Sequence, residues 1–273
     1  MPPGPLPARA PSPRGQTSPG DRIQQLLDDF GPRLQAGEAL RKVRKQQAGP
    51  ARQASGIAAI DELLEGGFSR GELSEITGPA SSGRTSLLLS LLATTTTTTT
   101  TGGRPSAGGG AELAALVDTP DAFDPPSARA AGVDLRRILW ARVSPWSEAM
   151  RCTERLLETE GLPLVVLDLA QSRGPSPGAR SETRIPRSAW IRLARRAAAS
   201  RTALVVLGEE CRAGEQARVA LELQPARARF TGFPPLLEEI ETRALLVRAP
   251  GAGRHRSVSV RLGPASPGAK SFG

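Results

Sequence analysis

A short stretch with two glycines, GPASSGRTS at residues 78–86, has the residue types and spacing of a phosphate-binding loop. Gly78 and Gly83 allow the backbone to bend so that successive N–H groups point inward, and a helix N-terminus behind such a nest attracts anions. The stretch therefore predicts a site for the phosphates of a nucleotide. The candidate binding residues are Gly78, Pro79, Ala80, Ser81, Ser82, Gly83, Arg84, Thr85 and Ser86.

The loop departs from the usual pattern G-x-x-x-x-G-K-[ST] at one position, because Arg84 replaces the lysine. Lysine is a compact point charge, whereas a guanidinium is a wide planar fork, so the two side chains are not equivalent beside a phosphate. We expect the loop to bind ATP, but we expect catalysis to suffer more than binding.

Thr85 and Asp168 are the candidate ligands of a magnesium ion. The hydroxyl of Thr85 follows the loop directly, and Asp168 ends the apolar run LPLVVLDLA, which is typical of a buried parallel strand. A carboxylate in that place can hold Mg²⁺ through water. A strand that simply ends in Asp would look the same, and the sequence leaves this alternative open.

The surrounding segments alternate between strand-like and helix-like patterns. A strand at 72–77 precedes the loop, and the apolar helix SLLLSLLA follows it. Further strands are predicted for AELAALVD, ILWARV, LPLVVLDLA, TALVVLGEE, RVALELQPA, RALLVRAP and SVSVRL, with helices at 147–160 and 189–199. This order predicts an α/β fold, a mostly parallel central sheet with helices on both faces.

The ends and one internal segment differ in composition from this core, which we assign to 49–262. Residues 1–20 contain seven prolines and predict a disordered tail, and 263–273 predict another. Residues 21–48 predict a helical arm that either mediates self-association or packs on its own core. The run of threonines and glycines at 94–110 predicts a low-complexity loop, because threonine is a poor helix former.

Composition limits the classes of function. The net charge of +9 favours an anionic partner such as nucleic acid, although arginine enrichment from coding bias would give the same charge. Two cysteines without CxxC spacing and a single histidine argue against a disulfide framework, a zinc site and a histidine-based triad. There is no apolar run long enough to span a membrane and no signal peptide, so we expect a soluble, cytoplasmic protein.

A cluster of arginines follows Asp168 and is the candidate face for single-stranded DNA. The chain has no tyrosine on which bases could stack, so phosphate contacts would dominate, and affinity would fall steeply with salt. A solvated basic helix face is the competing interpretation. The candidates are Arg173, Arg180, Arg184 and Arg187 in a loop and Arg192, Arg195 and Arg196 on the helix that follows.

Five stretches between about residues 55 and 262 together resemble the RecA recombinase family. They are SGIAAIDELLEGGFSRGELSEITGPASSGRTSLLL, ALVDTPDAFDPPSARAAGVDL, LPLVVLDLA, ALVVLGEE and ETRALLVRAP. The second is the most specific of them. The resemblance implies a RecA-like core that binds ATP with Mg²⁺, assembles on single-stranded DNA and takes part in DNA repair and recombination.

The departures from that family are informative. Pro120 stands where the family has a glutamate that activates water, with Asp118 or Asp121 as substitutes in a different geometry. The pair Glu209-Glu210 stands where the family has a glutamine that senses the terminal phosphate, and a carboxylate would repel that phosphate. The segment ECRAGEQ stands where the family has a long, glycine-rich DNA-binding loop, and it is short by comparison. We also expect no RecA-type C-terminal domain. Weak or absent ATP turnover is therefore expected, and no catalytic residue is assigned.

A RecA-like core with weakened motifs is similar to the ImuA family, accessory proteins of an error-prone polymerase in the SOS response to DNA damage. The resemblance implies an accessory protein that acts through contacts with DNA, RecA or such a polymerase. Two alternatives stay open. One is an active DNA-dependent ATPase or recombinase, and the other is a scaffold that binds no nucleotide.

Overall fold

The computed structural model describes residues 51–97, 100–101, 104–105, 111–159, 161–170, 185–234, 236–250 and 256–263. Several predictions lie outside these ranges: the tails, the helical arm, much of the threonine and glycine loop, and the loop carrying Arg173, Arg180 and Arg184.

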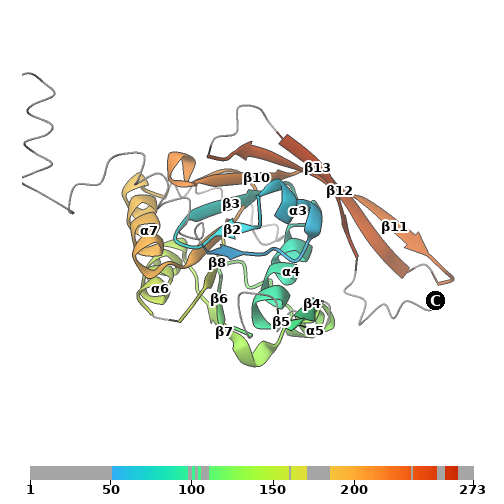
Figure 1. Cartoon of the computed structure of the whole chain (residues 1–273), viewed down its shortest axis with the longest axis horizontal. Helices are drawn as coiled ribbons and strands as arrows, with labels where there is room; N and C mark the ends of the chain where they lie inside the picture. Colours follow the sequence, from blue (N-terminus) through green and yellow to red (C-terminus); the bar gives the residue numbers. More distant parts are fainter. Residues whose placement is uncertain are drawn as a thin grey trace, which may run out of the picture. The chain divides into compact units, whose positions relative to one another are not determined.

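A nine-stranded sheet forms the centre of the described chain (Figure 1). Six strands run parallel in the order β10-β3-β9-β8-β6-β7, and β12 adds antiparallel to β10, with β11 and β13 antiparallel to β12. The strands are β3 (Leu73–Thr77), β6 (Ala114–Asp118), β7 (Ile138–Arg142), β8 (Leu164–Asp168), β9 (Ala203–Leu207), β10 (Val219–Leu223), β11 (Arg227–Thr231), β12 (Leu236–Arg248) and β13 (Arg256–Leu262). The predicted α/β class with a mostly parallel sheet is confirmed.

Helices cover both faces of this sheet (Figure 1). α3 (Ala58–Leu63), α4 (Arg84–Thr96) and α5 (Pro125–Ala130) pack on one face, and α6 (Trp146–Glu158) and α7 (Arg187–Ser200) pack on the other. The smaller elements are the pairs β1 (Arg52–Gln53) with β2 (Phe68–Ser69) and β4 (Thr100–Thr101) with β5 (Arg104–Pro105), and the 3-10 turns η2 (Leu135–Arg137) and η3 (Gly214–Gln216).

Alternation along the inner strands divides the core into two apolar layers. In β8, Leu164 and Val166 join the layer under α4, while Val165 and Leu167 join the layer under α6 and α7. Such a strand must be apolar on both faces, which explains the continuous runs in the sequence. Trp190 of α7 is the largest fully buried side chain in the second layer.

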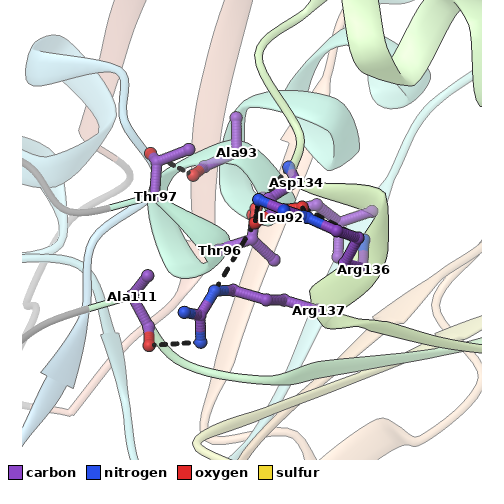
Figure 2. A network of polar contacts seen from close by, with 8 residues as sticks. All are labelled: Leu92, Ala93, Thr96, Thr97, Ala111, Asp134, Arg136 and Arg137. Atoms are coloured by element: carbon purple, nitrogen blue, oxygen red, sulfur yellow. Dashed lines mark hydrogen bonds and ion pairs between the residues drawn. The ribbon is translucent and has the colours of Figure 1, made fainter.

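The first threonines of the repeat belong to α4 instead of the expected loop. The helix continues through Thr96, and Thr95 and Thr96 are buried. The hydroxyl of Thr96 donates to the carbonyl of Leu92 at 2.8 Å and accepts from the backbone N–H of Asp134 at 3.1 Å (Figure 2). Burial and these hydrogen bonds outweigh the low helix propensity of threonine, so the boundary that we expected at 94 is wrong.

Asp134 extends this network toward η2. Its carboxylate pairs with Arg136 at 3.0 Å and with Arg137 at 3.5 Å, and Arg137 also donates to the carbonyl of Ala111 at 3.0 Å (Figure 2). The network joins the end of α4 to the segment that leads into β7.

The hairpin of β11 and β12 was not predicted. We expected a strand only from residue 243, yet β12 begins at Leu236 and pairs with β11. Every residue of β11 is exposed, so it lacks the alternating pattern of a half-buried strand. Phe230 is 59% exposed and Phe233 is fully exposed, and the hairpin extends away from the helices (Figure 1).

Candidate nucleotide-binding site

The candidate phosphate loop connects β3 to α4, as the sequence predicts. Gly83 caps the helix with φ of 95°, and Ser81 also has a positive φ, 64°. A Cβ on Gly78 would collide with the carbonyl oxygen of Leu223, and one on Gly83 would collide with the side chain of Leu262. The positive φ angles and the close approach of β10 and β13 therefore favour glycine at both positions.

Two side chains of this loop carry buried hydrogen-bond donors without a partner among the described residues. These donors are the Oγ of Ser82 and the Nη1 of Arg84. No side chain caps the N-terminus of α4, and its first turn carries no acidic residue. Buried donors without partners are costly, and this set fits an anion such as a nucleotide phosphate.

A small pocket of about 130 Å³ adjoins the start of α4 and brings the two predicted magnesium ligands together. Thr85, Asp118 and Asp168 all line it, together with Leu116 and Phe123. Asp118 and Asp168 are paired in register at the ends of the neighbouring parallel strands β6 and β8. Ligands of parallel sheets bind outside such carboxyl ends.

Both carboxylate oxygens of Asp118 accept hydrogen bonds from neighbouring residues of the fold. It is 2% exposed, and its two oxygens accept hydrogen bonds from the backbone of Ala122 at 3.1 Å, the backbone of Phe123 at 3.0 Å and the indole of Trp140 at 3.1 Å. These bonds fix the turn after β6. They leave Asp118 poorly suited to replace the missing glutamate as a base.

Asp121 forms an ion pair on the surface. Both of its oxygens accept from Arg142 at 2.6 Å, and this contact lowers the pKa of the Asp121 carboxyl. The guanidinium of Arg142 also lies over the ring of Trp140, 5.3 Å from its centre. A carboxylate with a lowered pKa is a weak base, so neither aspartate substitutes readily at the position of Pro120.

Asp168 lies at the end of β8, and its carboxyl has a raised pKa. Burial, together with the negative charge of Asp118, raises its pKa to about 6, against the opposing effects of the backbone N–H of Ala170 and the charge of Arg84. The N–H of Ala170 donates to Asp168 at 2.9 Å. A bound cation would relieve this cost of burying negative charge.

Most of the candidate DNA-binding arginines on α7 form ion pairs with glutamates of the same fold. Arg192 pairs with Glu154 at 2.9 Å, Arg196 pairs with Glu158, and Arg187 pairs with Glu215 at 2.8 Å. Arg195 is exposed and has no ion pair within the described part of the chain. Ion pairs between α6 and α7 explain much of the basic face that the sequence presents.

Sequence reasoning missed Glu75, a carboxylate inside β3 that is 1% exposed. One of its oxygens accepts from the backbone N–H groups of Arg212 and Ala213, both at 2.7 Å. The available signal was a single glutamate in LSEIT, an otherwise uncharged strand that leads into the phosphate loop. Glu209 and Glu210 are exposed and begin the segment that Glu75 holds.

Within the described ranges, none of the helices combines the length and the apolar character needed to cross a bilayer.

Comparison with known proteins agrees with this architecture. Residues 24–189 match the family model of the RecA N-terminal domain. The RecA protein of Chlorobaculum parvum is 35% identical over 115 residues, 42% of this chain and 30% of that protein. The RecA protein of Picosynechococcus is 31% identical over 146 residues, 54% of this chain and 37% of that protein. The chain thus spans well under half of these curated relatives.

A solved structure shares the fold at lower sequence identity. The crystal structure of the RadB recombinase superposes with a TM-score of 0.58 at 20% identity, covering 78% of this chain and 97% of that one. The family model matches more than half of the residues, including the phosphate loop and Asp168. The chain therefore belongs to the RecA family, through its match to the RecA N-terminal domain.

Proposed function

We propose that this chain is a RecA-like accessory protein of DNA repair and recombination that binds ATP with Mg²⁺ and hydrolyses it weakly or not at all. Binding would be the functional event, and the occupied loop would favour one state of its contacts with DNA or protein partners.

The observation that carries this proposal is the pair of buried, unpartnered donors at Ser82 and Arg84 beside an uncapped helix N-terminus. Backbone N–H groups of the loop and the Arg84 guanidinium would hold the phosphates, and Thr85 and Asp168 would hold the magnesium ion. When bound, the ion would neutralise phosphate charge. The loop residues would bind and orient the nucleotide, and neither Asp118 nor Asp121 is well placed as a base.

Weak turnover follows from the groups around Pro120. Asp118 is occupied by three N–H donors and Asp121 by Arg142. A general base must reach the proton that it abstracts and must have a suitable pKa. Arg84 in place of lysine removes the compact charge that usually accompanies phosphoryl transfer.

The partners are proposed from family membership and from charge. Membership in the RecA family supports a role in repair or recombination, and the net charge of +9 suits single-stranded DNA. The similarity to the ImuA family leads us to propose RecA or an error-prone polymerase as the protein partner in the SOS response. Self-association through the arm at 21–48 and a cytoplasmic location complete the proposal.

The test is calorimetry of Mg-ATP binding with the wild type and with Thr85→Ala, beside an ATPase assay with and without single-stranded DNA. Thr97→Ala is the matched control, because this exposed threonine lies at the far end of α4, where its hydroxyl donates to the carbonyl of Ala93 in the same helix. We expect binding that Thr85→Ala weakens at least tenfold, no change in Thr97→Ala, and no DNA-stimulated turnover.

The other results would favour the alternatives. Rapid turnover stimulated by DNA would make the protein an active ATPase. Absence of binding in the wild type would leave a nucleotide-free scaffold, and the pair Glu209-Glu210 is the feature that favours this second candidate.

A further inference from the structure

We infer that this site selects a nucleoside diphosphate over a triphosphate, and that Glu75 is the positioning residue that holds the selecting carboxylates, Glu209 and Glu210, in place. The inference rests on the proposed nucleotide binding and names the ligand of that same site.

Backbone pairing places Glu209 and Glu210 beside the phosphate loop. β3 and β9 are parallel neighbours, and Ile76 of β3 lies opposite Leu207, the last residue of β9. The N–H of Gly208 donates to the carbonyl of Ile76 at 3.1 Å. The acidic pair therefore follows β9 at the same end of the sheet at which Gly78 follows β3. Both segments therefore leave the same edge of the sheet, next to each other.

Glu75 ties the residues that follow the acidic pair to β3, the strand that leads into the phosphate loop. Its Oε1 accepts from the backbone N–H groups of Arg212 and Ala213, only two and three residues beyond Glu210. Its Oε2 is buried without a hydrogen-bond partner in the described structure, and burial raises the pKa of this carboxyl. A buried carboxyl with one unsatisfied oxygen is costly for stability, which points to a use in positioning this segment.

Two further contacts limit the movement of the segment. Thr77 is the residue directly before the phosphate loop, and its hydroxyl lies 4.0 Å from the sulfur of Cys211. At the other end, Arg248 of β12 donates to the carbonyls of Gly214 and Ala217. Together with the bond from Gly208 to Ile76 before the acidic pair, these contacts hold the turn at 209–211 at both of its ends.

Electrostatics then separates the two ligands. A diphosphate would be held by the backbone N–H groups of the loop and by Arg84, whereas a triphosphate would add further negative charge beside the segment that follows β9. Two carboxylates in that segment repel this added charge. We expect Mg-ADP to bind about tenfold more tightly than Mg-ATP at moderate salt, with the ratio shrinking as salt screens the charges.

The experiment measures dissociation constants for Mg-ADP and Mg-ATP by calorimetry on the full chain. The double variant Glu209→Gln/Glu210→Gln should tighten Mg-ATP at least fivefold and leave Mg-ADP within twofold of the wild type. Glu215→Gln is the matched control: it removes a charge from the same segment, at an exposed residue that pairs with Arg187, and should leave the ratio unchanged.

The role of Glu75 is tested separately. Glu75→Gln keeps a side-chain oxygen that can accept both N–H groups, so the ratio should stay at the wild-type value. Glu75→Ala removes this acceptor, and the ratio should fall toward that of the double variant. If Glu75→Ala does not fold, Glu75→Asp is used, because its carboxylate is one methylene short of the two donors.

The outcomes are distinguishable. If the wild type binds both nucleotides equally, or if the double variant leaves the ratio unchanged, the inference fails while the proposed function stands. If neither nucleotide binds, the proposed function and the inference fail together. A ratio that responds to the double variant but not to Glu75→Ala or Glu75→Asp would overturn the role of Glu75.

Discussion

Asp118 and Asp168 stand opposite each other at the carboxyl ends of β6 and β8, yet their surroundings differ sharply. Asp118 accepts three N–H donors, whereas Asp168 accepts the N–H of Ala170. One aspartate therefore holds the structure of the turn, while the other retains a carboxylate whose charge is poorly compensated. The two should respond differently to removal of that charge.

Asp168→Asn should stabilise the protein at neutral pH. The folded pKa of about 6 exceeds the ordinary value of 3.8, so the folded state holds the proton more tightly. This carboxyl therefore favours folding fully below about pH 4, and its contribution is lost as the pH rises through about 6. In denaturant titrations without magnesium, the variant should be about 2 kcal/mol more stable at pH 7.5 and nearly equal to wild type at pH 4. A constant difference at all pH values would contradict the raised pKa.

Asp118→Asn should destabilise the fold, in contrast. An asparagine offers one acceptor oxygen and turns an NH₂ group toward N–H donors that Asp118 now satisfies, at a cost of about 3 kcal/mol. Asp121→Asn is the control on the same turn and should have a much smaller effect on stability, because its pair with Arg142 is exposed and screened by solvent. Chemical denaturation of both variants measures the difference, and equal effects would refute the structural role of Asp118.

Gly83→Ala should be among the most damaging substitutions in the loop. The position has φ of 95°, and an added methyl group would meet Leu262, so we expect a loss of about 3 kcal/mol. Gly161→Ala shares a positive φ of 83° but opens into free space, and it should cost about 1 kcal/mol. Thermal melts of the pair separate backbone strain from the collision, and similar melting temperatures would remove Leu262 from the explanation.

Arg195→Ala tests whether α7 contacts DNA. If this helix binds the phosphate backbone, the variant should weaken binding of single-stranded DNA and reduce the dependence of affinity on salt by about one counterion. Arg192 and Arg196 are held by Glu154 and Glu158, so their alanine variants should act on stability more than on affinity. Arg136→Ala, on the other face of the sheet, is the control. Fluorescence anisotropy at several salt concentrations measures the affinity of each variant for single-stranded DNA. If the slope of log affinity against log salt concentration is unchanged in Arg195→Ala, the DNA contact lies elsewhere.

The sequence predicted the core of the fold because its strongest signals are local. Short continuous apolar runs such as the one that ends at Asp168 favour buried parallel strands. The order of strand, glycine loop and helix around Gly78 and Gly83 follows from backbone chemistry. The meeting of Thr85 with Asp168 also followed, because parallel strands bring their carboxyl ends to one edge.

The remaining features depend on contacts between distant segments. The anchoring role of Glu75 requires Arg212 and Ala213, more than 130 residues away in the chain. The strand β11 carries no periodic pattern, because all of its residues are exposed. The ion pairs of Arg192 and Arg196 with glutamates of α6 could not be predicted either, because the sequence of α7 indicates only a basic helix.

The threonine run beginning at Thr94 has a consequence for how the gene can change. Thr95 and Thr96 are core residues of α4, and Thr96 bonds to Asp134. Residues 94–101 are all threonine, so the gain or loss of one threonine gives the same protein sequence wherever in the run it occurs. The first positions of the run therefore still hold threonine after such a change. The run can thus change length by one residue while the helix that begins at the phosphate loop keeps its residues.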